Sequence, residues 1–111
     1  MKRYCLALDL KDDEELIKEY ELRHKSVAPA IIESITSAGI TVMDIYRAGN
    51  RLFMIMEVDE SFSFERKDAM DAANPAVQEW EQHVWKYQQA LPFAKPGEKW
   101  VLMEQIFALP A

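Results

Sequence analysis

Residues Leu52–Val58, with the sequence LFMIMEV, decide the fold of this chain. Successive side chains of a strand point to opposite faces, so every second residue from Leu52 to Val58 lies on one face, and Phe53 and Ile55 lie on the other. A strand that is apolar on both faces is covered on both. One layer of helices covers only one face, and in a chain of 111 residues a second copy is the simplest cover for the other. The segment therefore predicts a sheet with helices on one side, and a homodimer.

The neighbouring segments predict further strands and two helical regions around this strand. Residues 40–46 and the loop 47–51 precede it and predict a β-hairpin. The other expected elements are a strand at 4–8, a helical stretch that begins near Asp12, restarts at Pro29 and stops at Gly39, a short helix at 62–70, a helix from Asn74-Pro75 to Leu91, and a last strand at 100–107. This βαββαβ order predicts an α+β, ferredoxin-like fold with an antiparallel sheet.

The composition indicates that residues 1–111 form a single globular domain. The net charge of −6 and the scattered basic residues argue against a nucleic-acid partner. The apolar runs are far shorter than the ~20 residues that span a bilayer, and the N-terminus lacks the apolar segment of a signal peptide. We therefore expect a cytoplasmic protein without a membrane partner, in which the lone Cys5 is a small buried hydrophobe.

The sequence lacks the motifs of cofactor and metal chemistry. His24 and His83 are the two histidines of the chain and have no metal-ligand spacing, and the three glycines form no phosphate-binding loop. No Gly-x-Ser-x-Gly motif occurs, and Cys5 lies in a predicted strand, where nothing lowers its pKa. We therefore expect no metal and no cofactor, which leaves acid–base chemistry by side chains.

Tyr20 and His24 are the best candidates for that chemistry. They are four residues apart on the first predicted helix, so both side chains project from one face. Histidine gives and takes protons near neutral pH. The competing interpretation is that His24 is a helix histidine that is exposed to solvent or has its hydrogen bonds satisfied within the fold, and that Tyr20 packs in the core. Trp85 falls outside the apolar stripe of its helix, so it belongs to a pocket wall or to an interface.

Seven segments carry a resemblance that covers almost the whole chain. They are Glu19-Tyr20-x-x-Arg23-His24, Pro29, Ser37-x-Gly39, Ile45-Tyr46, Asn50-x-Leu52-Phe53, Trp85-Lys86-Tyr87 and Glu104-x-Ile106-Phe107-x-Leu109-Pro110. In this order and with nearly this spacing, they resemble the L-rhamnose mutarotases, also described as rhamnose/fucose-type mutarotases.

The resemblance implies an enzyme of the dimeric α/β barrel type that interconverts the α and β anomers of a 6-deoxy sugar without a cofactor. It implies that His24 is the proton donor and that Tyr20 and Trp85 contact the sugar. Glu104 is our candidate for the opposing base or for a partner of His24. The predicted sugar-binding set also includes Met43, Val84, Tyr46 and Tyr87.

The chain departs from the rhamnose-specific members at three places. Val84-Trp85 stands where they have paired tryptophans, Met43 where they have a tyrosine that contacts the sugar, and Ala28-Pro29-Ala30 where they have Trp-Pro-Glu. L-rhamnose and L-fucose differ in hydroxyl configuration, so a change of substrate requires different pocket residues. The departures therefore favour another 6-deoxy sugar, with L-fucose as the first candidate.

Two other functions fit the same elements. Small dimeric ferredoxin-like barrels also include cofactor-independent monooxygenases and haem-degrading enzymes, which use a helix histidine and buried aromatic residues. A sugar-binding module without catalysis is the third possibility, because Met43 and Val84 replace residues that contact the sugar.

Overall fold

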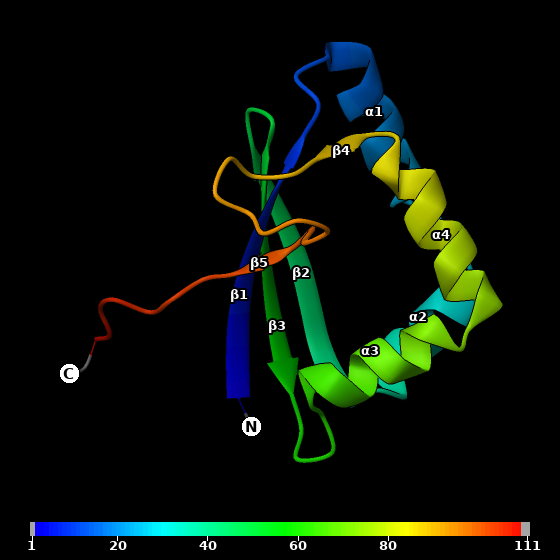
Figure 1. Cartoon of the computed structure of the whole chain (residues 1–111), viewed down its shortest axis with the longest axis vertical. Coiled ribbons are helices and arrows are strands. Elements are labelled where there is room, and N and C mark those ends of the chain that lie inside the picture. Colours follow the sequence, from blue (N-terminus) through cyan, green and yellow to red (C-terminus); the bar gives the residue numbers. More distant parts are fainter. Residues whose placement is uncertain (1, 110–111) are drawn as a thin grey trace.

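The structure, a computed structural model, describes residues 2–109 and consists of one sheet with the helices on one side of it (Figure 1). Pro110, the end of the last segment that resembles the family, lies outside the described residues. The elements are β1 Lys2–Leu10, α1 Glu14–Arg23, α2 Pro29–Thr36, β2 Ile40–Ala48, β3 Arg51–Val58, α3 Phe64–Ala72, α4 Pro75–Trp85, β4 Gln88–Gln89 and β5 Val101–Leu102.

The sheet is antiparallel, and its strands lie in the order β2-β3-β1-β4. β1 pairs with β3 along its length, from Lys2 opposite Val58 to Asp9 opposite Arg51. Because β3 occupies one edge of β1, both β4 and β5 lie on the other edge, where β5 pairs at Leu6 and Ala7. The strand order and the helices between the strands confirm the predicted arrangement.

The predicted hairpin of β2 and β3 is confirmed, and its strands extend closer to the turn than expected. Ala48 pairs with Arg51, so Gly49 and Asn50 form a two-residue loop. Gly49 has a φ of +59°, and a positive φ at the first loop position is typical of a type II′ turn. Glycine adopts this conformation without a steric penalty, which fixes the register of the two strands.

The starts of the helices follow the capping signals of the sequence. The side chain of Asp13 accepts hydrogen bonds from the main-chain N–H groups of Glu15 and Leu16, at 3.0 and 3.2 Å. Asn74 caps α4 in the same way, and Pro29 is at the start of α2. Because Asp13 and Asn74 satisfy N–H groups that a helix leaves unpaired, they fix where α1 and α4 begin, whereas α2 has a proline at its start and no side-chain cap.

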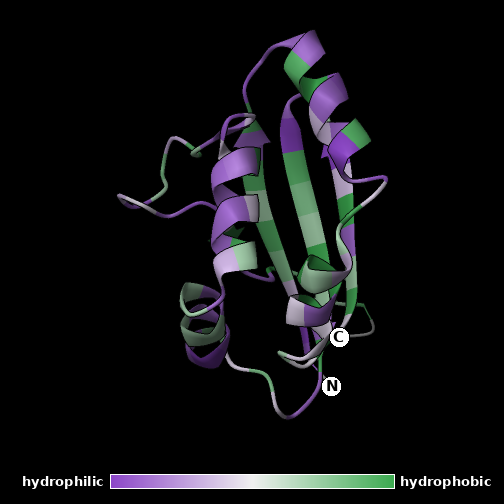
Figure 2. Ribbon diagram, turned by 90° about the vertical axis from the view of Figure 1, so that its right-hand side faces the viewer, coloured by the Kyte–Doolittle hydropathy of each residue, from purple (hydrophilic) through white to green (hydrophobic). Residues whose placement is uncertain are grey.

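The core lies between the inner face of the sheet and the helices, and every second residue of β3 from Leu52 to Val58 is buried in it. Figure 2 shows the largely hydrophobic strands of the sheet behind the helices. The core has two clusters toward opposite ends of β1. The α1-side cluster comprises Leu10, Tyr20, Leu52, Val84 and Tyr87. The α3-side cluster comprises Leu6, Ile40, Met54, Met56 and Val58, with Tyr4, Phe62 and Phe64 packed against it.

The prediction that the last helix continues to Leu91 is wrong. α4 ends at Trp85, and the chain turns back so that Gln88 and Gln89 pair with the end of β1. The main-chain N–H of Lys11 donates to the carbonyl of Tyr87 at 2.8 Å. Pairing with β1 therefore satisfies main-chain groups that a longer helix would have used internally.

The predicted last strand at 100–107 is also too long. β5 has two residues, Val101–Leu102, and one further main-chain hydrogen bond runs from Met103 N–H to the carbonyl of Cys5, at 2.7 Å. The tail, residues 103–109, then leaves the body of the protein (Figure 1). Its Ile106, Phe107 and Leu109 are 93, 75 and 84 % exposed.

Candidate active site

A cavity of about 580 Å³ lies between the inner face of the sheet and the helices, within the range of ~300–1,000 Å³ that small-molecule sites have. Tyr20 from α1 and His24 at its C-cap line this cavity together. Leu16, one turn before Tyr20, is half-buried and Tyr20 is buried, so this face of α1 packs toward the core. The prediction that a phenol and an imidazole reach one pocket is therefore confirmed.

The imidazole of His24 has two nitrogens with different surroundings. Nδ1 lies 2.9 Å from the main-chain carbonyl oxygen of Tyr20. A carbonyl oxygen only accepts hydrogen bonds, so Nδ1 carries a hydrogen and donates it. In the neutral ring Nε2 is then the nitrogen with the free lone pair. The main-chain contact thus prepares Nε2 to accept and return a proton.

Tyr20 has a buried side chain with a polar neighbour. The side-chain amide of Gln88 donates to the Tyr20 hydroxyl at 3.4 Å, and Gln88 is itself buried. Burial raises the pKa of Tyr20 above its ordinary value, and the hydrogen bond from Gln88 opposes that shift. Tyr20 therefore remains protonated at neutral pH. Because its oxygen accepts from Gln88, its hydrogen can be donated to a bound molecule.

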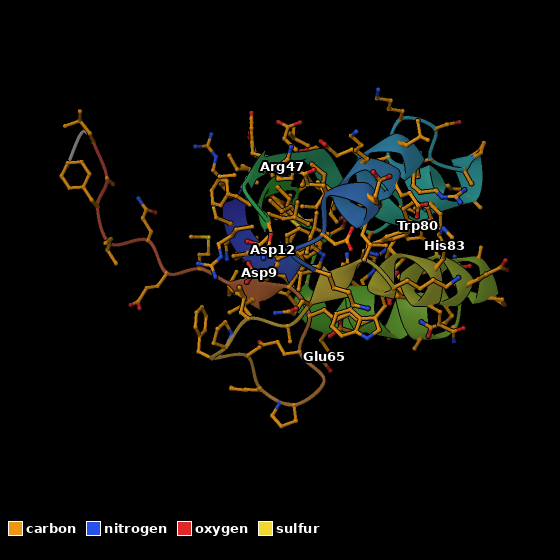
Figure 3. All side chains as sticks on the ribbon, turned by 90° about the horizontal axis from the view of Figure 1, so that it is seen from above. Asp9, Asp12, Arg47, Glu65, Trp80 and His83 are labelled. Atoms are coloured by element: carbon orange, nitrogen blue, oxygen red, sulfur yellow. The ribbon has the colours of Figure 1, made fainter. Side chains whose placement is uncertain are left out.

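Aromatic rings surround the imidazole. The ring centroid of His24 is 4.3 Å from that of Tyr20 and 5.4 Å from that of Trp80 on α4. Trp80 and Trp100 both line the cavity. Figure 3 shows Trp80 where α4 faces the helices at the start of the chain. These contacts fix the orientation of the imidazole ring.

Met43 and Val84, two of the remaining predicted residues, also line the cavity. Tyr87 packs in the α1-side cluster with its ring centroid 6.3 Å from that of Tyr20, behind the cavity wall. Tyr46 is 57 % exposed and points from β2 to the face opposite Met43.

The last two predicted residues lie outside the cavity of their own chain. Trp85 is 38 % exposed, and the ammonium group of Lys99 lies 5.1 Å from the centroid of its ring. Glu104 is exposed on the tail. The structure therefore brings neither residue to His24 within one chain.

Several polar and aromatic residues of the cavity are not among those predicted from the sequence. Helical spacing assigns Trp80 to the buried face of its helix, and that face also forms the cavity wall. Gln88 gives no signal, because the predicted helix continues through it. Lys67 and Asp71 also line the cavity. The one feature of the sequence that could indicate them is their i,i+4 spacing as an oppositely charged pair on α3.

A second recess, of about 540 Å³, lies on the outer side of the helices between α2 and α4. It is lined by Ala28, Ala30 and His83 among others, while Ile31 and Trp80 separate it from the cavity. Figure 3 marks His83 beside Trp80 on α4. His24 and His83 thus lie on different sides of the helical layer, which makes His83 a matched control for His24.

Neither a metal cluster nor a membrane helix occurs in the described part of the chain. Among residues 2–109, no three side chains of His, Cys, Asp or Glu are grouped as metal ligands. Within the same range, every helix is too short or too polar to cross a membrane.

Comparison with solved structures places the fold. An L-rhamnose mutarotase from Formosa agariphila superposes with a TM-score of 0.73 at 18 % identity, over 98 % of this chain and 99 % of that one. The tetracenomycin F2 cyclase of Streptomyces glaucescens superposes with a TM-score of 0.60 at 18 % identity, over 100 % and 99 % of the two chains. These likenesses confirm the predicted α+β, ferredoxin-like fold of the dimeric α/β barrel class.

Sequence comparison gives the family. An L-fucose mutarotase of Xanthomonas campestris pv. campestris is 45 % identical over 98 % of this chain and 89 % of its own length. A UPF0734 protein of Dictyostelium discoideum is 35 % identical over 97 % and 90 %. The profile of the L-rhamnose mutarotase family matches residues 3–109. The chain therefore belongs to the L-rhamnose mutarotase family of carbohydrate isomerases.

Proposed function

We propose that this protein is a mutarotase that interconverts the α and β anomers of a 6-deoxy-L-hexose without a cofactor. The observation that carries the proposal is the pair of Tyr20 and His24 in one apolar cavity, with Nδ1 of His24 bound to a carbonyl. Family membership and the 45 % identity to an L-fucose mutarotase support it.

The reaction needs two proton transfers in each direction. In ring opening, protonated His24 gives the hydrogen on Nε2 to the ring oxygen while a base removes the hydrogen of the anomeric hydroxyl. The bond between the ring oxygen and the anomeric carbon breaks, and the anomeric carbon becomes an aldehyde. Ring closure on the other face of the aldehyde reverses both transfers. A positioned acid or base of this kind contributes roughly 10²–10⁴-fold to the rate.

Tyr20 supports the chemistry as a hydrogen-bond donor. Its raised pKa keeps the phenol protonated, and Gln88 occupies an acceptor site on its oxygen. We infer that the phenol hydrogen binds a sugar oxygen and orients the ring toward Nε2 of His24. This role differs from that of His24, because Tyr20 holds its proton throughout.

L-fucose is the substrate that we propose. Met43 and Val84 line the cavity at two of the positions where the sequence departs from the rhamnose-specific pattern. Their apolar side chains remove hydrogen-bonding and stacking groups, so the pocket selects a different set of hydroxyls. The relative from Xanthomonas campestris, an L-fucose mutarotase, supports this choice.

We also propose that the protein is a homodimer. The outer face of the sheet carries Phe53 and Ile55, both half-buried, and the exposed Tyr46. The tail adds three exposed apolar side chains, Ile106, Phe107 and Leu109. A second copy that covers this face would bury them, and the tail of one copy would then lie against the other. Glu104 as a partner of His24 and Trp85 as a sugar contact remain possible only in that assembly, because neither residue lines the cavity of its own chain.

Exchange of anomers measured by NMR saturation transfer tests the activity. We expect faster exchange for L-fucose, and less acceleration for L-rhamnose, at a catalytic concentration of the protein. An unchanged rate for both sugars would refute the mutarotase.

Two further results would favour the alternative functions. Binding of either sugar without a change in rate would favour the sugar-binding module, and a Soret band on titration with haemin would favour a haem enzyme.

A further inference from the structure

The cavity contains a second polar group, on α3, that the proposed proton transfers do not use. The ammonium nitrogen of Lys67 lies 2.6 Å from each carboxylate oxygen of Asp71. Both residues line the cavity, and their side chains are 16 and 18 % exposed. A charged pair thus faces a cavity whose walls are mostly apolar, with Leu6, Met54, Met56, Phe62 and Phe64 among them.

Stabilisation of α3 does not account for this pair. Helix pairs at i,i+4 contribute roughly 0.2–0.5 kcal/mol, and the order of Lys before Asp opposes the helix dipole. Removing charges from water costs more than such a pair returns unless further hydrogen bonds complete the site. The pair still has unused hydrogen-bonding capacity, because Lys67 has a third hydrogen and each Asp71 oxygen has a free lone pair.

The pair lies away from the acid–base residues. Tyr20 belongs to the α1-side cluster at the Leu10 end of β1. Phe64, on the same helix as Lys67, packs on the α3-side cluster, where its ring centroid lies 4.9 Å from that of Tyr4. Figure 1 shows α1 and α3 at opposite ends of the sheet. The position of Asp71 is fixed further, because its carbonyl accepts a hydrogen bond of 2.9 Å from the side chain of Gln78.

We propose that Lys67 and Asp71 bind the hydroxyls of the sugar that are remote from the anomeric carbon, directly or through one water, and thereby determine which sugar is accepted. This inference rests on the proposed function. A hydroxyl in an apolar cavity needs a hydrogen-bond partner, and neighbouring hydroxyls both donate and accept. The Lys67–Asp71 pair offers both a donor and acceptors in one place.

Two double variants and one control test the inference. Lys67→Asp with Asp71→Lys exchanges the charges, keeps an i,i+4 pair on α3 and places Asp before Lys, the better order for a helix. Lys67→Met with Asp71→Leu removes the charges. Glu65→Gln is the control, because Glu65 is exposed on the same helix and does not line the cavity. Each protein is assayed for KM and kcat with L-fucose and L-rhamnose, and for its unfolding temperature.

We expect the charge exchange to keep the unfolding temperature within a few degrees but to raise KM for the preferred sugar about 10- to 100-fold. The ratio of kcat/KM between the two sugars should change as well, and Glu65→Gln should match the wild type. If the exchanged pair has wild-type KM and selectivity while the wild type is active, the pair is structural and the inference fails alone. A wild type inactive on both sugars would overturn the proposed function together with this inference.

Discussion

The proposed roles of His24 and Tyr20 differ because the surroundings of the two side chains differ. The imidazole is half-buried, with Nδ1 fixed on a carbonyl, so its other nitrogen remains available for proton transfer. The phenol is buried, which raises its pKa and keeps its proton in place. In the proposed mechanism, His24 is thus the proton carrier and Tyr20 is a donor that keeps its proton. This separation of roles depends on burial and on single hydrogen bonds.

The raised pKa of Tyr20 predicts how stability changes in alkali. The folded protein holds the phenol proton more tightly than the unfolded chain does, so this contribution is fully present below the ordinary tyrosine pKa of ~10 and is lost as pH rises through the folded value. In Tyr20→Phe, denaturant unfolding between pH 8 and 11 should show a shallower loss of stability. Equal slopes for Tyr20→Phe and the wild type would contradict the assignment of the raised pKa to Tyr20.

At the scale of elements, the corner between α2 and β2 depends on Gly39. Its φ is +96°, and a Cβ there would lie 2.5 Å from Ser61 Oγ and 2.6 Å from Asp59 Oδ1. Hydrogen bonds from Ser61 lower the pKa of Asp59, and Arg66 donates to the carbonyl oxygens of Ala38, Ser61 and Ser37. The corner thus joins the end of α2 to the start of α3.

Gly39→Ala should therefore destabilise the protein more than an alanine at another positive-φ glycine. Gly97 has a φ of +80°, and a Cβ added there would meet no atom within 4 Å, so Gly97→Ala isolates the backbone strain, about 1–2 kcal/mol. Gly39→Ala should lose at least about twice that, because the Cβ displaces the Asp59–Ser61 contact. Urea unfolding of both variants measures the difference, and equal losses would show that the contact is unimportant.

Local signals predict most of the elements, and long-range pairing decides the exceptions. Asp13, Pro29 and Asn74 predict helix starts through their own hydrogen bonds or fixed φ, and those starts are correct within two residues. The end of α4 at Trp85 depends on the pairing of Gln88 with β1, at the far end of the sequence. No pattern within the helix itself carries that information.

At the scale of the whole molecule, the outer face of the sheet and the tail leave apolar surface uncovered. Light scattering at micromolar concentration should therefore give twice the monomer mass. Ile55→Lys, and separately removal of residues 104–111, should shift the protein toward monomer while it stays folded. Leu22→Glu, at an exposed residue of α1 on the other side of the sheet, should leave the dimer intact. A strictly monomeric wild type would refute the dimer.

Only part of the candidate site is predictable from the sequence. Tyr20 and His24 are predictable because helical spacing fixes their common face. Gln88 and Trp100 reach the same cavity from β4 and from the loop before β5, so only the folded chain brings them to Tyr20 and His24. Spacing along one element predicts neighbours on that element, whereas a cavity depends on how several elements pack.

The most direct measurement compares the two histidines by the rate of anomer exchange at neutral pH. His24→Gln should lose about 10²–10⁴-fold of the acceleration, because Nε2 is then unable to carry the proton. His83→Gln should stay within about twofold of the wild type, because His83 lies on the outer side of the helices and does not line the cavity where the proton is transferred. If folded His24→Gln exchanges anomers as fast as the wild type, the imidazole in the cavity is not the proton carrier and the proposed mechanism is wrong.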